Sequence, residues 1–168
     1  WDNGTVFKDG LPVKSPDLCT WLILQMDFLI REAETLGLPE EQAKWSERNS
    51  KMLALLLNNL LTDEGFLAVR VSGSDDLPVD SESLLLFLPL LLGNRIPENV
   101  RSKLLDKLVA ERKYFTPYGF ASEPLDSKLF LEDGYWRGAV WPPTAYLISE
   151  LLLNCDRREE ALRNAAAY

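Results

Sequence analysis

The chain has 168 residues, a length that predicts one domain. It carries 18 Lys and Arg residues against 26 Asp and Glu residues, a net charge of −8, and this acidic balance argues against nucleic acid or an anionic membrane as a partner, because both attract basic clusters. The sequence contains no histidine and only two cysteines. A Cys/His zinc site and any mechanism with a histidine base are therefore excluded, and acid–base chemistry falls to carboxylates.

The first third of the chain predicts a loop and two long helices. Residues 1–14 are rich in Gly, Asp and Lys and predict the loop. The segment Ser15-Pro16-Asp17 predicts a helix start, because a capping hydroxyl precedes a proline and an acid, and apolar residues follow at helical spacing as far as Gly37. Pro39 opens a second helix in the same way, which Asp63-Glu64-Gly65 ends.

The middle of the chain predicts a short extended piece and two further helices. Residues 66–71 favour the extended piece, and residues 73–78 predict a loop. The apolar run 84–92 predicts a helix rather than a buried strand because it is rich in Leu and poor in Val and Ile, and it is too short to span a membrane. Pro97 opens the next helix, which continues to Val109.

The last third begins with a long stretch that lacks helical periodicity. Residues 113–141 concentrate Tyr, Phe and Trp, and helices resume over 143–153 and 157–167. About six helices with little strand predict an all-α fold in which consecutive helices pack as antiparallel hairpins.

The most distinctive motif of this stretch is Gly134-Tyr135-Trp136-Arg137-Gly138-Ala139-Val140-Trp141-Pro142-Pro143. Aromatic faces and a guanidinium fork form a surface that suits sugars, whose C–H faces stack on aromatic rings while their hydroxyls bond to planar donors. The same residues also fit a plug at the end of a helical bundle, with Arg137 bridging carbonyl groups. Composition alone leaves both interpretations open.

The segment from Tyr135 to Trp141 resembles the YWRGxxW motif of (α/α)6-barrel glycoside hydrolases. The most similar group is glycoside hydrolase family 63, with its processing α-glucosidases and mannosylglycerate hydrolases, and trehalases are more distant relatives. Weaker similarities at residues 15–18, 61–66 and 118–122 follow in the family's order. The resemblance therefore covers nearly the whole chain.

The resemblance implies site residues. In these enzymes the general acid is the Asp of an S-G-W-D-x-S segment, which Trp1-Asp2-Asn3 matches in part, so Asp2 is the implied proton donor. The match departs from the pattern at Gly4, where Ser is common. Asp17 is either a cleft residue or a helix cap. The substrate-binding residues that the resemblance implies are Trp1, Asp17, Tyr135, Trp136, Arg137, Gly138 and Trp141.

The implied reaction is the inverting, exo-acting hydrolysis of α-glucosidic or α-mannosidic bonds. Such a mechanism needs a second carboxylate as general base. The family's base is a Glu on a later helical hairpin, and no Glu of this chain matches it, so the base is expected outside these residues. Glu123, Glu132 and Asp133 flank the aromatic stretch, and we interpret them as solvated loop charges.

The length of the chain predicts about half of a toroid, because twelve helices of ~11–12 residues with their connections need roughly twice as many residues. Residues 1–168 are thus expected to be part of a glycosidase catalytic domain that is inactive in isolation and retains sugar affinity. The open faces of a half toroid predict self-association. The absence of an initial Met predicts that Trp1 is not a translation start.

Two alternatives come from other functional classes. An all-α interaction module would use the aromatic stretch for protein contacts, without chemistry. A lyase or epimerase on the same barrel usually relies on His or Tyr bases, and the lack of His counts against it. The sequence implies no metal or organic cofactor, although calcium at the acidic loops stays an open alternative.

Overall fold

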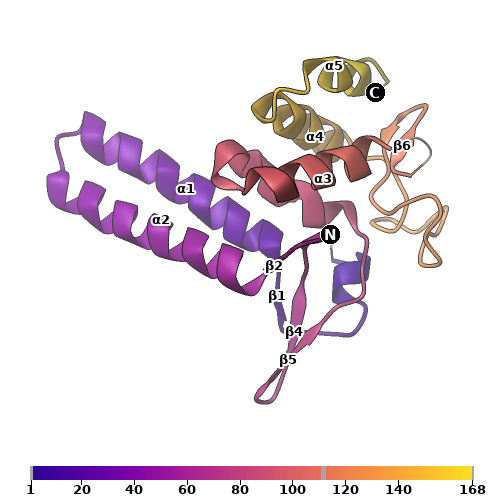
Figure 1. Cartoon of the computed structure of the whole chain (residues 1–168), viewed down its shortest axis with the longest axis horizontal. Coiled ribbons are helices and arrows are strands. Elements are labelled where there is room, and N and C mark those ends of the chain that lie inside the picture. The colour runs from indigo at the N-terminus through magenta and orange to yellow at the C-terminus, as the bar shows by residue number, and fades with distance from the viewer. Residues whose placement is uncertain (1, 111–112, 168) are drawn as a thin grey trace.

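The computed structural model describes residues 2–110 and 113–167. Two long helices, α1 (Pro16–Thr35) and α2 (Pro39–Asn59), form an antiparallel hairpin at one side of the molecule (Figure 1). Both begin with proline in the first turn, as the sequence predicts. The turn between them uses Gly37 at a φ of 67°, and the Leu38 N–H donates to the carbonyl of Ala33 at 2.8 Å, which closes the end of α1.

The remaining helices form two further pairs. Helices α1, η2 and α4 lie side by side, and each is covered by the helix that follows it in the chain, which confirms the all-α fold of helical hairpins. The described residues thus form three helical pairs, and an (α/α)6 toroid has six. The further helices are η2 (Leu84–Arg95), α3 (Glu98–Val109), α4 (Pro142–Asn154) and α5 (Arg158–Ala167), and a short helix η1 (Thr5–Phe7) lies in the first loop.

The apolar run 84–92 is helical, but it forms a 3-10 helix rather than an α-helix. Pro89 lies inside it and has no N–H to donate, and Gly93 breaks the helix with a φ of 56°. Every residue from Leu84 to Gly93 is buried, so this segment is packed on all sides and shows no amphipathic pattern. It is the centre of the hydrophobic core, between α1 and α4.

The prediction of a loop over 73–78 is wrong. Strands β4 (Val69–Ser72) and β5 (Asp75–Pro78) form a hairpin, and β1 (Val13–Lys14) pairs with β4 on the other side. The turn holds Gly73 at a φ of 65°, which a tight two-residue hairpin requires. The acidic Asp75 and Asp76 are poor strand formers, and cross-strand pairing overrides that preference.

Two small hairpins repeat one motif before the inner helices η2 and α4. In each, a Thr hydroxyl donates to the carbonyl of the Gly three residues later and accepts the N–H two residues later, so Thr62 with Gly65 matches Thr116 with Gly119. Each Gly has positive φ, and the next outer helix approaches it, α3 at Gly65 and α5 at Gly119. The strands are β2 (Leu61–Thr62), β3 (Gly65–Phe66), β6 (Phe115–Thr116) and β7 (Gly119–Phe120).

We expect Gly65→Ala to destabilise the fold by about 2–4 kcal/mol, because the new Cβ combines strained backbone with overpacking. That Cβ would lie 2.6 Å from Cδ2 of Leu104 at a φ of 131°. Gly37→Ala is the matched control, since no atom lies within 4 Å of its Cβ, and it should cost only about 1–2 kcal/mol. Urea unfolding of both variants measures the difference, and equal losses would contradict the close packing at Gly65.

A polar contact joins the first hairpin to η2. Arg95 donates two hydrogen bonds to Asp27 of α1, from Nη1 at 3.1 Å and from Nη2 at 2.7 Å. Buried Asn49 of α2 donates to Asp27 Oδ1 at 2.8 Å and to the carbonyl of Ile23 at 2.9 Å. Three helices thus meet at one carboxylate, which fixes how α1, α2 and η2 pack.

The connections between helices differ in length at the two ends of the pairs. Residues 36–38, 96–97 and 155–157 make short links within each pair. The long segments 60–83 and 110–141 precede the inner helices η2 and α4, just as residues 2–15 precede α1. The long loops therefore gather where the inner helices begin, and this end of the molecule carries the candidate site.

Candidate functional site

Asn3 joins the start of the chain to the aromatic stretch. Its Nδ2 donates to the carbonyl oxygen of Gly134 at 3.0 Å, and its Oδ1 accepts the backbone N–H of Trp136 at 3.0 Å. The two bonds bracket Tyr135 and connect segments that lie far apart in the sequence. Because Asp2 directly precedes Asn3, the predicted acid and the predicted sugar-binding residues belong to one region of the molecule.

Three aromatic rings pack together in this region, and we refer to Tyr135, Trp136 and Trp141 as the aromatic cluster. The centroids of the two indoles lie 5.2 Å apart with 36° between their planes. Tyr135 packs edge-on against Trp136 at 5.6 Å and against Trp141 at 5.0 Å. The Trp141 Nε1–H donates to the Tyr135 carbonyl at 2.9 Å, which orients this indole. The cluster offers apolar faces beside polar backbone groups, as a sugar-binding surface requires.

The glycines of the motif let the loop fold tightly on itself. A Cβ at Gly134 would lie 2.5 Å from the Cβ of Leu131, and a Cβ at Gly138 would lie 2.7 Å from the carbonyl oxygen of Leu131. The N–H of Gly138 donates to Oγ of Ser122 at 3.0 Å, in a buried contact. The structure thus gives Gly138 a protein partner for its N–H and a shaping role in the loop.

Arg137 takes part in the loop through its side chain and its backbone. Its Nε donates to the carbonyl oxygen of Leu129 at 3.1 Å, and its own carbonyl accepts the N–H of Leu131 at 2.8 Å. The side-chain bond to a carbonyl is the contact that the bundle-plug interpretation predicts. Arg137 therefore stabilises the loop that holds the aromatic cluster, with a half-buried side chain.

The other predicted site residues lie in different settings. The Asp2 side chain is exposed at the start of the described chain, and Trp1 lies outside the described residues. Asp17 is half-buried in the first turn of α1 and accepts a hydrogen bond from Oγ of Ser15. No hydrogen bond or ion pair between described residues joins Asp17 to the aromatic cluster.

Glu123 is a buried carboxylate, so the interpretation of this residue as a solvated loop charge is wrong. Its side chain has 0% exposure, whereas Glu132 and Asp133 are exposed as expected. Oε2 accepts the Thr5 hydroxyl at 2.8 Å, and Oε1 accepts the Ser127 hydroxyl at 2.8 Å. Burial raises the pKa of Glu123, and the two hydrogen bonds oppose that shift.

The raised pKa predicts a pH dependence of stability. The folded chain holds the Glu123 proton at pH values where the unfolded chain has released it, so stability falls as pH rises from about the ordinary pKa of 4.5 through the raised value. We expect the free energy of unfolding of the wild type, minus that of Glu123→Gln, to decrease over this window and then to level off. Denaturant unfolding across pH 4–8 measures the difference, and a difference that rises with pH would contradict the assignment.

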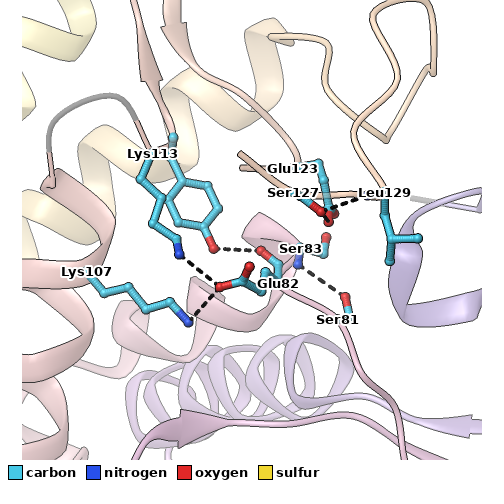
Figure 2. A network of polar contacts seen from close by, with 9 residues as sticks. Ser81, Glu82, Ser83, Lys107, Lys113, Glu123, Ser127 and Leu129 are labelled. Carbon is cyan, nitrogen blue, oxygen red and sulfur yellow. Dashed lines mark hydrogen bonds and ion pairs between the residues drawn. The ribbon is translucent and has the colours of Figure 1, made fainter. Parts of the chain in front are cut away.

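A second polar group lies beside the candidate site, around Glu82. Lys113 and Lys107 both pair with Glu82 Oε1, at 3.0 and 3.3 Å, and Figure 2 shows the carboxylate between the two ammonium groups. Burial opposes ionisation of Glu82, but the hydrogen bonds and the positive charges of the two lysines together outweigh it and lower the pKa of Glu82. The Tyr114 hydroxyl donates to the Glu82 carbonyl at 2.7 Å. These contacts fix residues 81–83, directly before η2.

Two further properties concern the part of the chain that the structure describes. Within it, no group of three or more Cys, Asp or Glu side chains is arranged to hold a metal ion. None of the described helices has the length and apolar character that crossing a bilayer requires.

Comparisons with known proteins agree with this fold. The family model for the mannosylglycerate hydrolase MGH1-like glycoside hydrolase domain matches residues 1–168. Over 137 residues the chain is 31% identical to a protein of Schizosaccharomyces pombe described as a probable mannosyl-oligosaccharide glucosidase, a match that covers 79% of the chain and 17% of that protein. The chain belongs to the MGH1-like glycoside hydrolase domain family.

Two solved structures from Thermus thermophilus share the fold. One is a GH63 mannosylglycerate hydrolase in complex with glucose, with a TM-score of 0.76 and 23% identity over 92% of this chain and 36% of that one. The other is an uncharacterized conserved protein, with a TM-score of 0.77 and 21% identity over 92% of this chain and 37% of that one. The chain thus spans little more than one third of each of these solved relatives.

Proposed function

We propose that the chain forms the acid side of the active site of an inverting, exo-acting glycoside hydrolase that cleaves α-glucosidic or α-mannosidic bonds. The observation that carries the proposal is the pair of hydrogen bonds from Asn3 to the loop at Gly134 and Trp136. It brings an exposed carboxylic acid, Asp2, next to a loop of clustered aromatic rings. The carbohydrates named for the relatives, a mannosyl-oligosaccharide and mannosylglycerate, fit this pairing of an acid with stacking surfaces.

In this proposal Asp2 is the general acid. Its carboxyl proton passes to the glycosidic oxygen as the bond to the anomeric carbon breaks, while water attacks that carbon from the opposite face. A second carboxylate must take a proton from this water, at roughly 6.5–9.5 Å from the acid. We place that base outside this chain, because no Glu of the chain matches the family's base, and Glu123 is buried and engaged by two hydroxyls.

The substrate-binding part of the proposal rests on the aromatic cluster. The indoles of Trp136 and Trp141 stack on sugar C–H faces. Trp1, which lies outside the described residues and precedes Asp2 in the sequence, is the third indole that we propose for sugar binding. Arg137 keeps the loop in shape and presents its remaining guanidinium N–H groups to substrate hydroxyls. Gly138 supports the same loop, and Asp17 contributes a carboxylate near the start of α1.

Isothermal titration with glucose, mannose and trehalose, combined with an assay on α-glucosides and α-mannosides, tests this function on the chain itself. We expect binding of at least one sugar without hydrolysis. If the chain hydrolyses one of these substrates and Asp2→Asn abolishes the activity, the base lies within the chain. That result would contradict the proposal that the chain forms only the acid side of the active site. A chain that binds none of these sugars would contradict the carbohydrate proposal and favour the interaction module.

We also propose that the chain self-associates through an apolar groove lined by α1 and α2. In a closed toroid every helical pair lies between two others, and here α1 and α2 leave an apolar groove of about 460 Å³ whose lining includes Leu22, Met26 and Leu55. Leu22 and Leu55 are 42% and 48% exposed. Such a contiguous apolar surface favours association.

Sedimentation velocity tests the self-association. We expect a dimer that Leu55→Glu converts to a monomer, because a carboxylate in the groove is costly to desolvate. Leu36→Glu is the control, since Leu36 is 68% exposed in the turn after α1 and lies outside the groove. A wild type that stays a 19.1 kDa monomer at high concentration would contradict the proposal.

A further inference from the structure

Two neighbouring residues, Ser122 and Glu123, connect to the two parts of the candidate site. Ser122 Oγ accepts the N–H of Gly138, in the loop of the aromatic cluster, at 3.0 Å. Glu123 Oε2 accepts the hydroxyl of Thr5, three residues after Asp2, at 2.8 Å. Ser122 and Glu123 are both fully buried. One dipeptide therefore touches both the segment with the acid and the loop with the aromatic rings.

This dipeptide is itself fixed to the core. The carbonyl of Ser122 accepts the N–H of Leu84 at 2.9 Å, at the first residue of η2. The second Glu123 oxygen accepts the Ser127 hydroxyl at 2.8 Å, a pair that Figure 2 shows. Oγ of Ser83, the residue before η2, donates to the Ser122 carbonyl at 3.5 Å. The position of the dipeptide is thus set by the most buried helix of the molecule.

Each oxygen of the Glu123 carboxylate accepts a hydrogen bond from a different hydroxyl. A buried carboxyl group is costly to remove from water, and only its hydrogen bonds offset that cost. One oxygen binds Ser127 in its own loop, which stabilises that loop locally. The other binds Thr5 across 118 positions of sequence, and the Thr5 hydroxyl also contacts Oγ of Ser81 at 2.6 Å. This oxygen is thus one of the contacts that hold the first segment of the chain.

We propose that Glu123 is a positioning residue: through Thr5 it holds the Asp2 segment against the aromatic cluster. The inference builds on the proposed function, in which Asp2 and the cluster act on one sugar. Glu123 does not touch that sugar. It acts through Thr5, and Asn3 then completes the connection by bonding to Gly134 and Trp136.

Two matched variants separate positioning from simple stability. Thr5→Val and Ser127→Ala each remove one hydroxyl donor from the same carboxylate. Each also removes one further contact, that of Thr5 with Oγ of Ser81 at 2.6 Å and that of Ser127 with the N–H of Leu129 at 3.1 Å. We measure the nuclear Overhauser effect (NOE) between the Asn3 side-chain amide and the Trp136 backbone amide, and glucose affinity by tryptophan fluorescence. We expect Thr5→Val to abolish the NOE and to weaken glucose binding about tenfold, the effect of one lost hydrogen bond. Ser127→Ala should keep both.

Variants of Glu123 itself test the same proposal should Thr5→Val fail to fold. Glu123→Gln keeps an acceptor oxygen for Thr5 and should retain the NOE, whereas Glu123→Asp shortens the reach of the carboxylate and should lose it. Equal effects of the two hydroxyl variants, or loss of the NOE in Glu123→Gln, would overturn the proposal. If the wild type shows the NOE but binds no glucose, the proposed function fails while the NOE comparison still decides the role of Glu123.

Discussion

Trp136→Ala is expected to weaken sugar binding by about 10- to 100-fold, equivalent to about 1.4–2.7 kcal/mol. Trp136 supplies one of two indoles whose centroids lie 5.2 Å apart, and its backbone N–H donates to Asn3. The substitution removes a stacking face and leaves the backbone contact in place. Titration calorimetry with the sugar that the wild type binds measures the loss.

Trp45→Ala is the matched control for this prediction. Trp45 belongs to α2, where Lys44 and Arg48 stack over its ring, and it lies on the first hairpin rather than at the aromatic cluster. Its removal should leave sugar affinity unchanged. A Trp136→Ala chain that binds as tightly as the Trp45→Ala chain would show that the aromatic cluster is only a structural plug.

Asp27→Ala is expected to destabilise the fold by about 2–4 kcal/mol, the largest loss that we predict for a polar side chain. The change leaves the Arg95 guanidinium without its two hydrogen bonds and buried Asn49 without one acceptor. Asp27→Asn keeps an oxygen for Asn49 and should cost less. Urea unfolding of both variants gives the two losses.

An exposed ion pair serves as the control for Asp27. Asp106 accepts a hydrogen bond from Arg157 at 2.7 Å, with the Asp106 side chain 69% exposed. Asp106→Ala should therefore cost no more than about 1 kcal/mol. If Asp27→Ala lowers the free energy of unfolding no more than Asp106→Ala does, the contact that joins three helices at Asp27 does not stabilise the fold more than an exposed ion pair.

The helices could be predicted from the sequence because their signals are local. Prolines at the first turn mark the starts of α1, α2 and α4, and Gly37 marks the end of the first helix. The 3-10 form of η2 was not predicted, because it depends on Pro89 inside a segment that is packed on all sides. The strand at Asp75 was missed because cross-strand pairing overrides its weak propensity.

The candidate site could be predicted only in part. The motif of aromatic residues predicted the cluster that the structure shows, and Asp2 stays a prediction from the resemblance. The contacts of Asn3 and Glu123 were not predicted. Their partners Trp136 and Thr5 lie more than a hundred positions away, and no local pattern encodes such contacts. The one signal that the sequence offers at Glu123 is an acid that follows Phe120-Ala121-Ser122, and the structure shows that these three residues are buried.

A glucose titration followed by amide NMR tests most directly whether the first residues and the aromatic loop form one sugar site. We predict that the Asn3 side-chain amide and the indole N–H groups of Trp136 and Trp141 shift together, with a single dissociation constant. Shifts of the two indoles without any change at Asn3 would contradict the account, because the acid segment would then lie apart from the bound sugar.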